Sequence, residues 1–179
     1  MKNLWLSLGL ATALLSGASL SAQALPASPL ALHARACDAH QLSLSLKDQD
    51  GSLAGMSHNG ALLVLRNRSS VACQIPALPR LKLENAHRSA LDFKQLGPIR
   101  WGVGPVMMPV TLQPGAEASG QLRWVSSDTY EANNSIRAKY LLVEVGRKTL
   151  RTTFHALMFG AKHQAPELTL DPLRRVTLP

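Results

Sequence analysis

The fold is decided by the stretch Gln41-Leu42-Ser43-Leu44-Ser45-Leu46-Lys47, in which leucine and polar side chains alternate without a break. Successive side chains of a β-strand point to opposite faces, so this alternation puts three leucines on one face and the polar groups on the other. The pattern predicts a half-buried strand over residues 41–47. It is the first indication that the chain has an all-β fold.

Further extended segments follow this first strand. Residues 61–65 are apolar on both faces, which is typical of a central strand, and residues 80–84 and 121–125 alternate again. Other expected strands are residues 110–112, 140–145, 149–159 and 168–178. Turns containing Gly and Pro separate them, and no window shows a sustained apolar period of about 3.6 residues. We therefore expect an all-β, antiparallel two-sheet sandwich of about 7–9 short strands.

The first 24 residues predict a cleavable secretory signal peptide. Lys2 supplies a cation, residues 4–15 form an apolar run, and Ala22-Gln23-Ala24 is a small-residue cleavage site. The run is shorter than the roughly 18 residues that span a bilayer, so we expect cleavage after Ala24 and no stable membrane anchor. The first cysteine is Cys37, which argues against a lipid anchor at the cleavage point. The expected location is the periplasm or the medium outside the cell.

The remainder divides into a short tether, residues 25–36, and one domain, residues 37–179, expected to be a monomer. Without Lys2 it keeps 18 of the 19 basic residues against 11 acidic ones, a formal charge of +7. The cations are scattered, which is typical of a solvated surface; the alternative is a face that attracts anionic envelope polymers or lipid head groups. Export and a chain with only eight aromatic residues argue against nucleic acid as a partner.

The chain has two cysteines, Cys37 and Cys73. An even number of cysteines in an exported chain predicts a disulfide. Closing a loop of this length contributes about 3 to 4 kcal/mol in the chain-entropy model. Two free buried thiols are the alternative. A disulfide would agree with export, because such bonds persist chiefly in oxidising compartments.

Five short motifs occur in the order of a known family, and together they cover residues 37–145. They are Cys37-Asp38-Ala39-His40-Gln41-Leu42; Leu63-Val64-Leu65-Arg66-Asn67 before Cys73; Ile75 to Pro79 before Leu81; Leu112-Gln113-Pro114-Gly115 with Ala118; and Leu122-Arg123-Trp124. In these motifs the chain resembles the exported bacterial family called domain of unknown function 4232. It resembles a divergent member, because Ala77-Leu78-Pro79 stands where Gly-Tyr-Pro is common. The resemblance implies an immunoglobulin-like sandwich in the bacterial envelope, with no assigned activity.

One candidate metal site surrounds the first cysteine. His33 and His40 place two imidazoles near the Cys37 thiol and the Asp38 carboxylate, a set that could bind a soft or borderline metal. A disulfide would remove the thiolate from this set.

Copper-type binding is a second metal hypothesis, since thioether and imidazole both suit Cu(I). The pairs that carry it are Met56 with His58, Met107 with Met108, and His155 with Met158. His155 and Met158 are expected on opposite strand faces, being three residues apart in a period of two. The other interpretation is methionine in the core and histidine on the surface.

No catalytic or cofactor site is predicted. The stretch Asp48-Gln49-Asp50-Gly51 resembles the start of a calcium loop but lacks the later carboxylates, so it is expected to be a hairpin turn. Neither Gly-x-Ser-x-Gly nor His-Glu-x-x-His occurs. We expect a non-enzymatic binding or structural module of the envelope, whose partner is a protein or an anionic polymer and whose longest loop is residues 97–109. The alternative is a periplasmic copper-type protein.

Overall fold

A computed structural model of the protein describes residues 34–98 and 107–176. The predicted signal peptide, most of the predicted tether, His33 and most of the 97–109 segment lie outside the described residues. The described residues include no helix with the length and apolarity that a membrane crossing requires.

The described chain is all-β, as predicted, with one short 3₁₀ helix, η1, at Ala39–Gln41. The strands are β1 Leu42–Lys47, β2 His58–Asn67, β3 Cys73–Ile75, β4 Leu81–Glu84, β5 Ala90–Leu91, β6 Lys94–Leu96, β7 Val110–Leu112, β8 Glu117–Val125, β9 Asn133–Val145, β10 Lys148–Ala161, β11 Glu167–Leu170 and β12 Arg174–Arg175. These twelve strands exceed the expected number because β3, β5 and β6 are too short to show a period, and residues 168–178 divide into β11 and β12. Also, β9 and β10 are longer than expected.

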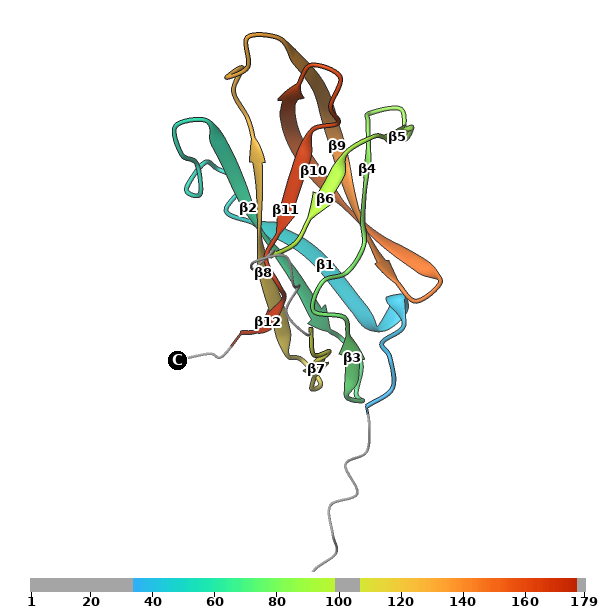
Figure 1. Ribbon diagram of the computed structural model, residues 1–179. Coiled ribbons are helices and arrows are strands. Elements are labelled where there is room, and N and C mark those ends of the chain that lie inside the picture. Colours follow the sequence, from blue (N-terminus) through green and yellow to red (C-terminus); the bar gives the residue numbers. More distant parts are fainter. Residues whose placement is uncertain (1–33, 99–106, 177–179) are drawn as a thin grey trace, which may run out of the picture. The chain divides into compact units, whose positions relative to one another are not determined.

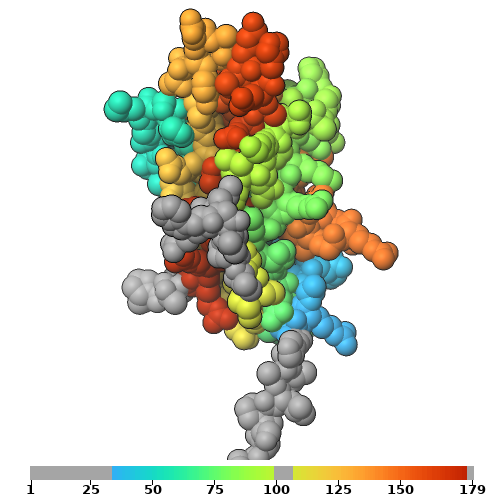
Figure 2. Space-filling view, in the orientation of Figure 1, coloured from blue at the N-terminus to red at the C-terminus, as the bar shows by residue number. Residues whose placement is uncertain are grey.

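Two larger sheets face each other, with strand orders β1-β2-β8-β11-β6 and β10-β9-β4-β5, and β12 pairs with β8 (Figure 1). A third, small sheet joins β3 to β7. The strand pairs are antiparallel, as predicted, except that β11 and β6 run parallel. β6 and β11 are not consecutive in the chain, which enters β6 from β5 of the other sheet. No hairpin turn therefore requires these two strands to be antiparallel. The two strands lie side by side on the surface (Figure 2).

The core lies between the two larger sheets. Trp124 of β8 contacts Phe154 of β10 edge to face, with ring centroids 5.0 Å apart and planes at 82°. Alternate apolar side chains of β2 and β9, such as Leu63 and Leu141, are fully buried around this pair. An edge-to-face aromatic pair adds about 0.5 to 1.5 kcal/mol beyond the area that it buries. The arrangement is that of an open sandwich.

The predicted disulfide between Cys37 and Cys73 is confirmed, with Cα atoms 4.9 Å apart and both side chains buried. Beside it the backbone N–H of Gln74 donates to the carbonyl of Arg35 at 2.8 Å, and Ala36 bridges Gln74. The end of the predicted tether is therefore already part of the domain, because it lies along β3.

Asn67, at the end of β2, is the one fully buried polar residue among those described, and all its side-chain groups are satisfied. Its amide nitrogen donates to the carbonyls of Val71 at 2.8 Å and Leu112 at 3.0 Å. Its amide oxygen accepts from the backbone N–H of Ser69 at 2.9 Å and from the Ser69 hydroxyl at 2.8 Å. Asn67 thus joins β2 to β7 and shapes the loop that leads to Cys73.

Candidate anion-binding site

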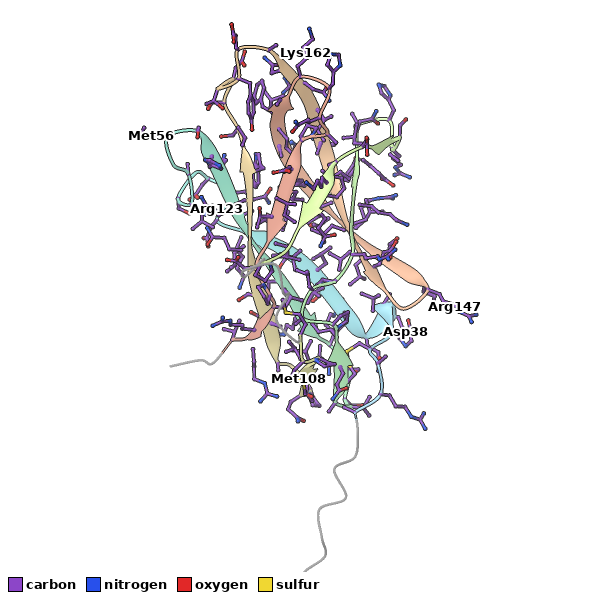
Figure 3. The ribbon with its side chains drawn as sticks, viewed as in Figure 1. Asp38, Met56, Met108, Arg123, Arg147 and Lys162 are labelled. Carbon is purple, nitrogen blue, oxygen red and sulfur yellow. A yellow bond between two sulfur atoms is a disulfide. The ribbon has the colours of Figure 1, made fainter. Side chains whose placement is uncertain are left out.

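The copper-type candidates are not brought to a common point in the described residues. Met56 precedes β2, whereas Met108 precedes β7, which contacts the other end of β2 through Asn67. Ten extended residues separate those ends, a span of about 30 Å, and Figure 3 shows the two methionines far apart. Met56 and Met108 are both highly exposed, and the described residues include no group of three His, Cys, Asp or Glu side chains that could hold a metal.

Met107 and His58 have other neighbours. Met107 is half-buried and lines a surface hollow with Leu62 and Ser119. The Nδ1 atom of His58 lies 3.0 Å from the Ser57 hydroxyl. Met56 and His58 line one exposed hollow together, but Met107 lines a different one, so the described candidates do not come together as one set.

The pair His155 and Met158 is separated as predicted. Met158 is fully buried in the core, whereas His155 is exposed. Their opposite orientation follows from the two-residue period of β10.

The residues around the first cysteine serve local structure. Asp38 caps η1: its carboxylate accepts from the His40 backbone N–H at 3.3 Å, and Gln41 Oε1 accepts from the Asp38 backbone N–H at 2.7 Å. The backbone hydrogen bond from His40 lowers the pKa of Asp38, and the His40 ring, 2.8 Å away, acts in the same direction. Since Cys37 is in the disulfide, no thiolate is present beside His40.

The stretch 48–51 is a turn, as predicted, although it does not form a tight hairpin. It begins a ten-residue connection between β1 and β2, residues 48–57. The carboxylate of Asp50 accepts from the Ser52 backbone N–H at 3.0 Å, and this hydrogen bond lowers the pKa of Asp50. The carboxylate is used in shaping the turn, which is a common role of Asp in loops.

A cationic cleft, which the sequence patterns did not predict, lies on β9 and β10 beside the β4–β5 turn. It has a volume of about 570 Å³. Its lining consists of Asn85, Ala86, His87, Arg137, Ala138, Lys139, His155, Ala156 and Leu157. Four of these residues carry basic side chains, and none of the described lining residues is acidic.

The β4–β5 turn holds His87 at one wall of the cleft. The side-chain oxygen of Asn85 accepts from the backbone N–H groups of His87 at 2.9 Å and Ser89 at 3.0 Å. Such a local bond is typical of asparagine in turns, where it replaces strand pairing. The backbone of Arg88, with φ of 62°, completes the reversal. The sequence Asn85 to Ser89 therefore fixes the direction in which this wall projects.

A bulge in the β9–β10 pair forms the opposite side of the cleft. The register shifts between Thr153 and Ala156, so that two residues of β10 oppose Lys139 alone. A bulge reorients side chains locally and is frequent near functional sites. Here Lys139 Nζ lies 3.4 Å from Nδ1 and 3.3 Å from Nε2 of His155. Ala138 and Ala156, which are paired across the strands and belong to the buried core, also line the cleft.

The charge in the cleft is not balanced by neighbouring acids. On the same sheet Glu84 pairs with Arg151 at 2.9 Å, and Glu144 pairs with Lys82 at 2.7 Å. No ion pair in the described part of the chain involves Arg137 or Lys139. Two permanent cations and two imidazoles facing a hollow can hold a carboxylate or a phosphate, which accept hydrogen bonds from such groups.

The sequence did contain a signal for this cleft. Ile136-Arg137-Ala138-Lys139 alternates apolar and basic side chains, which predicts a strand with both cations on one face. The contribution of His87 and His155 had no comparable signal, because only strand pairing brings them near Arg137.

Comparison with protein families identifies a relationship. Residues 37–174 match a family described as Domain of unknown function (DUF4232). No curated protein and no solved structure matches the chain.

Proposed function

Because the chain belongs to the DUF4232 family, whose description leaves the activity open, we propose that it is an exported, non-enzymatic binding module that holds an anionic group in the cationic cleft. The observation that carries this proposal is the composition of the cleft: His87, Arg137, Lys139 and His155 line it without an acidic neighbour in the lining. Charge-assisted hydrogen bonds from such groups are about twice as strong as neutral ones.

Export is supported by two independent features of the chain. The N-terminal residues have the pattern of a signal peptide with cleavage after Ala24. The disulfide between Cys37 and Cys73 fits an oxidising compartment. In this proposal the protein has an immunoglobulin-like sandwich fold and works in the periplasm or outside the cell. N-terminal sequencing of the protein recovered from the cell envelope tests the cleavage: Leu25 as the first residue is expected, and Met1 would contradict export by this route.

The cleft is tested by calorimetric titration with citrate, inorganic phosphate and oligoglutamate at low salt. The variant Arg137→Gln with Lys139→Gln removes both permanent cations from the cleft. The matched control, Arg123→Gln with Arg147→Gln, removes the same charge from β8 and from the β9–β10 turn, outside the cleft lining (Figure 3).

We expect at least one of these anions to bind. The cleft variant should lose at least about tenfold in affinity, because each hydrogen bond to a charged group contributes about 1.5 to 3 kcal/mol. Binding should weaken as salt screens the cations. Equal affinities for the cleft variant and the control would contradict the proposed site.

A further inference from the structure

The free edge of β9 adjoins the cationic cleft. β9 pairs with β10 along its whole length, from Asn133 to Val145. On the other side β4 pairs only with residues 140–143, and the last pair joins Glu84 to Tyr140. Residues 133–139 of β9 therefore have no strand on this side in the described part of the chain. An unpaired strand edge offers a row of backbone N–H and C=O groups.

The cleft adjoins this unpaired edge and also extends over the β9–β10 pair, since His155 to Leu157 of β10 line it as well. Three consecutive residues of β9, Arg137 to Lys139, line one part of it. The other wall is the segment Asn85 to His87, which follows β4 directly and leaves the sheet there. Because β4 turns away at Glu84, residues 133–139 of β9 keep β10 as a strand partner on one side and have none on the other side among the described residues. The cleft lies beside this unpaired edge.

We propose that residues 133–139 of β9 receive an extended acidic segment of a partner protein as an added β-strand. This inference rests on the proposed function, since the same cleft supplies the charge. Backbone hydrogen bonds from the edge would hold the segment, and acidic side chains at every second position would reach Arg137 and Lys139. Seven residues of β-strand span about 24 Å, which is long enough for a stable pairing of this kind.

A protein segment fits this edge better than a polysaccharide or a phosphate polymer does. All three kinds of polymer can supply negative charge to His87, Arg137, Lys139 and His155. Only a polypeptide carries amide donors and acceptors at the spacing of the strand edge. The pairing gives affinity, and the alternate acidic side chains give specificity.

The cations have a competing explanation, because charged side chains on an edge also prevent two copies of a chain from pairing. The two explanations differ in what happens when an acidic strand is offered. If the cations only prevent pairing, the edge of β9 binds no added strand. If the edge is a binding site, it binds the acidic strand. Charge reversal should then transfer the preference to a basic strand.

The test measures fluorescence anisotropy of labelled ten-residue peptides with the protein recovered from the cell envelope after expression of the full chain. The acidic peptide alternates Glu with Val or Thr, and a second peptide carries Lys in place of every Glu. Two further acidic peptides are N-methylated on one or the other set of alternate amides. The protein variants are Arg137→Glu with Lys139→Glu and, as the matched control, Arg123→Glu with Arg147→Glu.

We expect the unmodified acidic peptide to bind and one of the two N-methylated peptides to bind about tenfold more weakly, because two or more hydrogen bonds are lost. The charge-reversed cleft variant should prefer the lysine peptide, and the control variant should behave as the parent does. Amide hydrogen exchange within residues 133–139 should slow when the acidic peptide is bound.

Equal binding of all three acidic peptides would overturn the strand-addition inference and leave the anion-binding function standing. Absence of binding by every acidic peptide, together with no response to citrate, phosphate or oligoglutamate, would overturn both. Self-association of the neutral variant, Arg137→Gln with Lys139→Gln, together with no binding of any peptide to the parent, would show that the cations prevent two copies from pairing, and it would also overturn the inference.

Discussion

Replacing Asn67 with alanine is expected to lower the free energy of unfolding by about 3 kcal/mol. The substitution removes both hydrogen bonds that the side-chain amide donates and both that its oxygen accepts. The Val71 carbonyl keeps a donor, because the Ser69 hydroxyl lies 3.0 Å away. The Leu112 carbonyl, which is buried, and the Ser69 N–H, which is partly buried, lose their bonds to Asn67. Leaving a buried polar group unsatisfied costs about 1 to 3 kcal/mol, and a partly buried one costs less.

Urea unfolding monitored by tryptophan fluorescence, with the disulfide intact, measures this loss. The matched control is Asn134→Ala, since Asn134 is exposed and its side chain donates one hydrogen bond, to the Gln164 carbonyl at 3.2 Å. That change should stay within about 0.5 kcal/mol of the parent. A loss below about 1 kcal/mol for Asn67→Ala would refute the role of Asn67 as the junction between β2 and β7.

Three further changes test other parts of the fold. Cys37→Ala with Cys73→Ala should lower the free energy of unfolding by about 4 kcal/mol in the chain-entropy model; urea midpoints equal to those of the parent would contradict a structural disulfide. Gly120→Ala places a Cβ 2.5 Å from a backbone carbonyl oxygen and should cost about 1 to 3 kcal/mol, so an unchanged thermal midpoint would show that this contact relaxes freely. The hydrogen bond from Lys82 lowers the pKa of Glu144, so the pair stabilises the fold at neutral pH and loses this contribution as the pH falls through the lowered pKa. Lys82→Gln should raise the pKa of Glu144 toward its ordinary value in an NMR titration, and no change would contradict the pairing.

The strands that the sequence predicted are those whose burial pattern is local. Residues 41–47 and 121–125 alternate because one face meets the core, and they became β1 and part of β8. Strands of two or three residues, such as β5 and β6, hold too few side chains to show any period. The parallel pairing of β6 with β11 depends on a long-range arrangement of the chain, for which no short segment carries a signal.

The cleft was missed for a similar reason. Arg137 and Lys139 show their shared face in the sequence, but the strand in which they lie was expected to begin at residue 140 and begins at Asn133. In the sequence, His155 stands near Met158 and shows no relation to Lys139. Its approach to Lys139 depends on the register of the β9–β10 pair, including the bulge. Residue types alone did not specify that register.

NMR shift mapping of an oligoglutamate titration tests the anion-binding cleft most directly, because it reports where on the surface the ligand lies. If the ligand binds in the cleft, the largest backbone and side-chain shifts fall on His87, Arg137, Lys139 and His155, which line it. Shifts spread evenly over the exposed cations, or centred on another face such as that of Arg123, would contradict binding in the cleft.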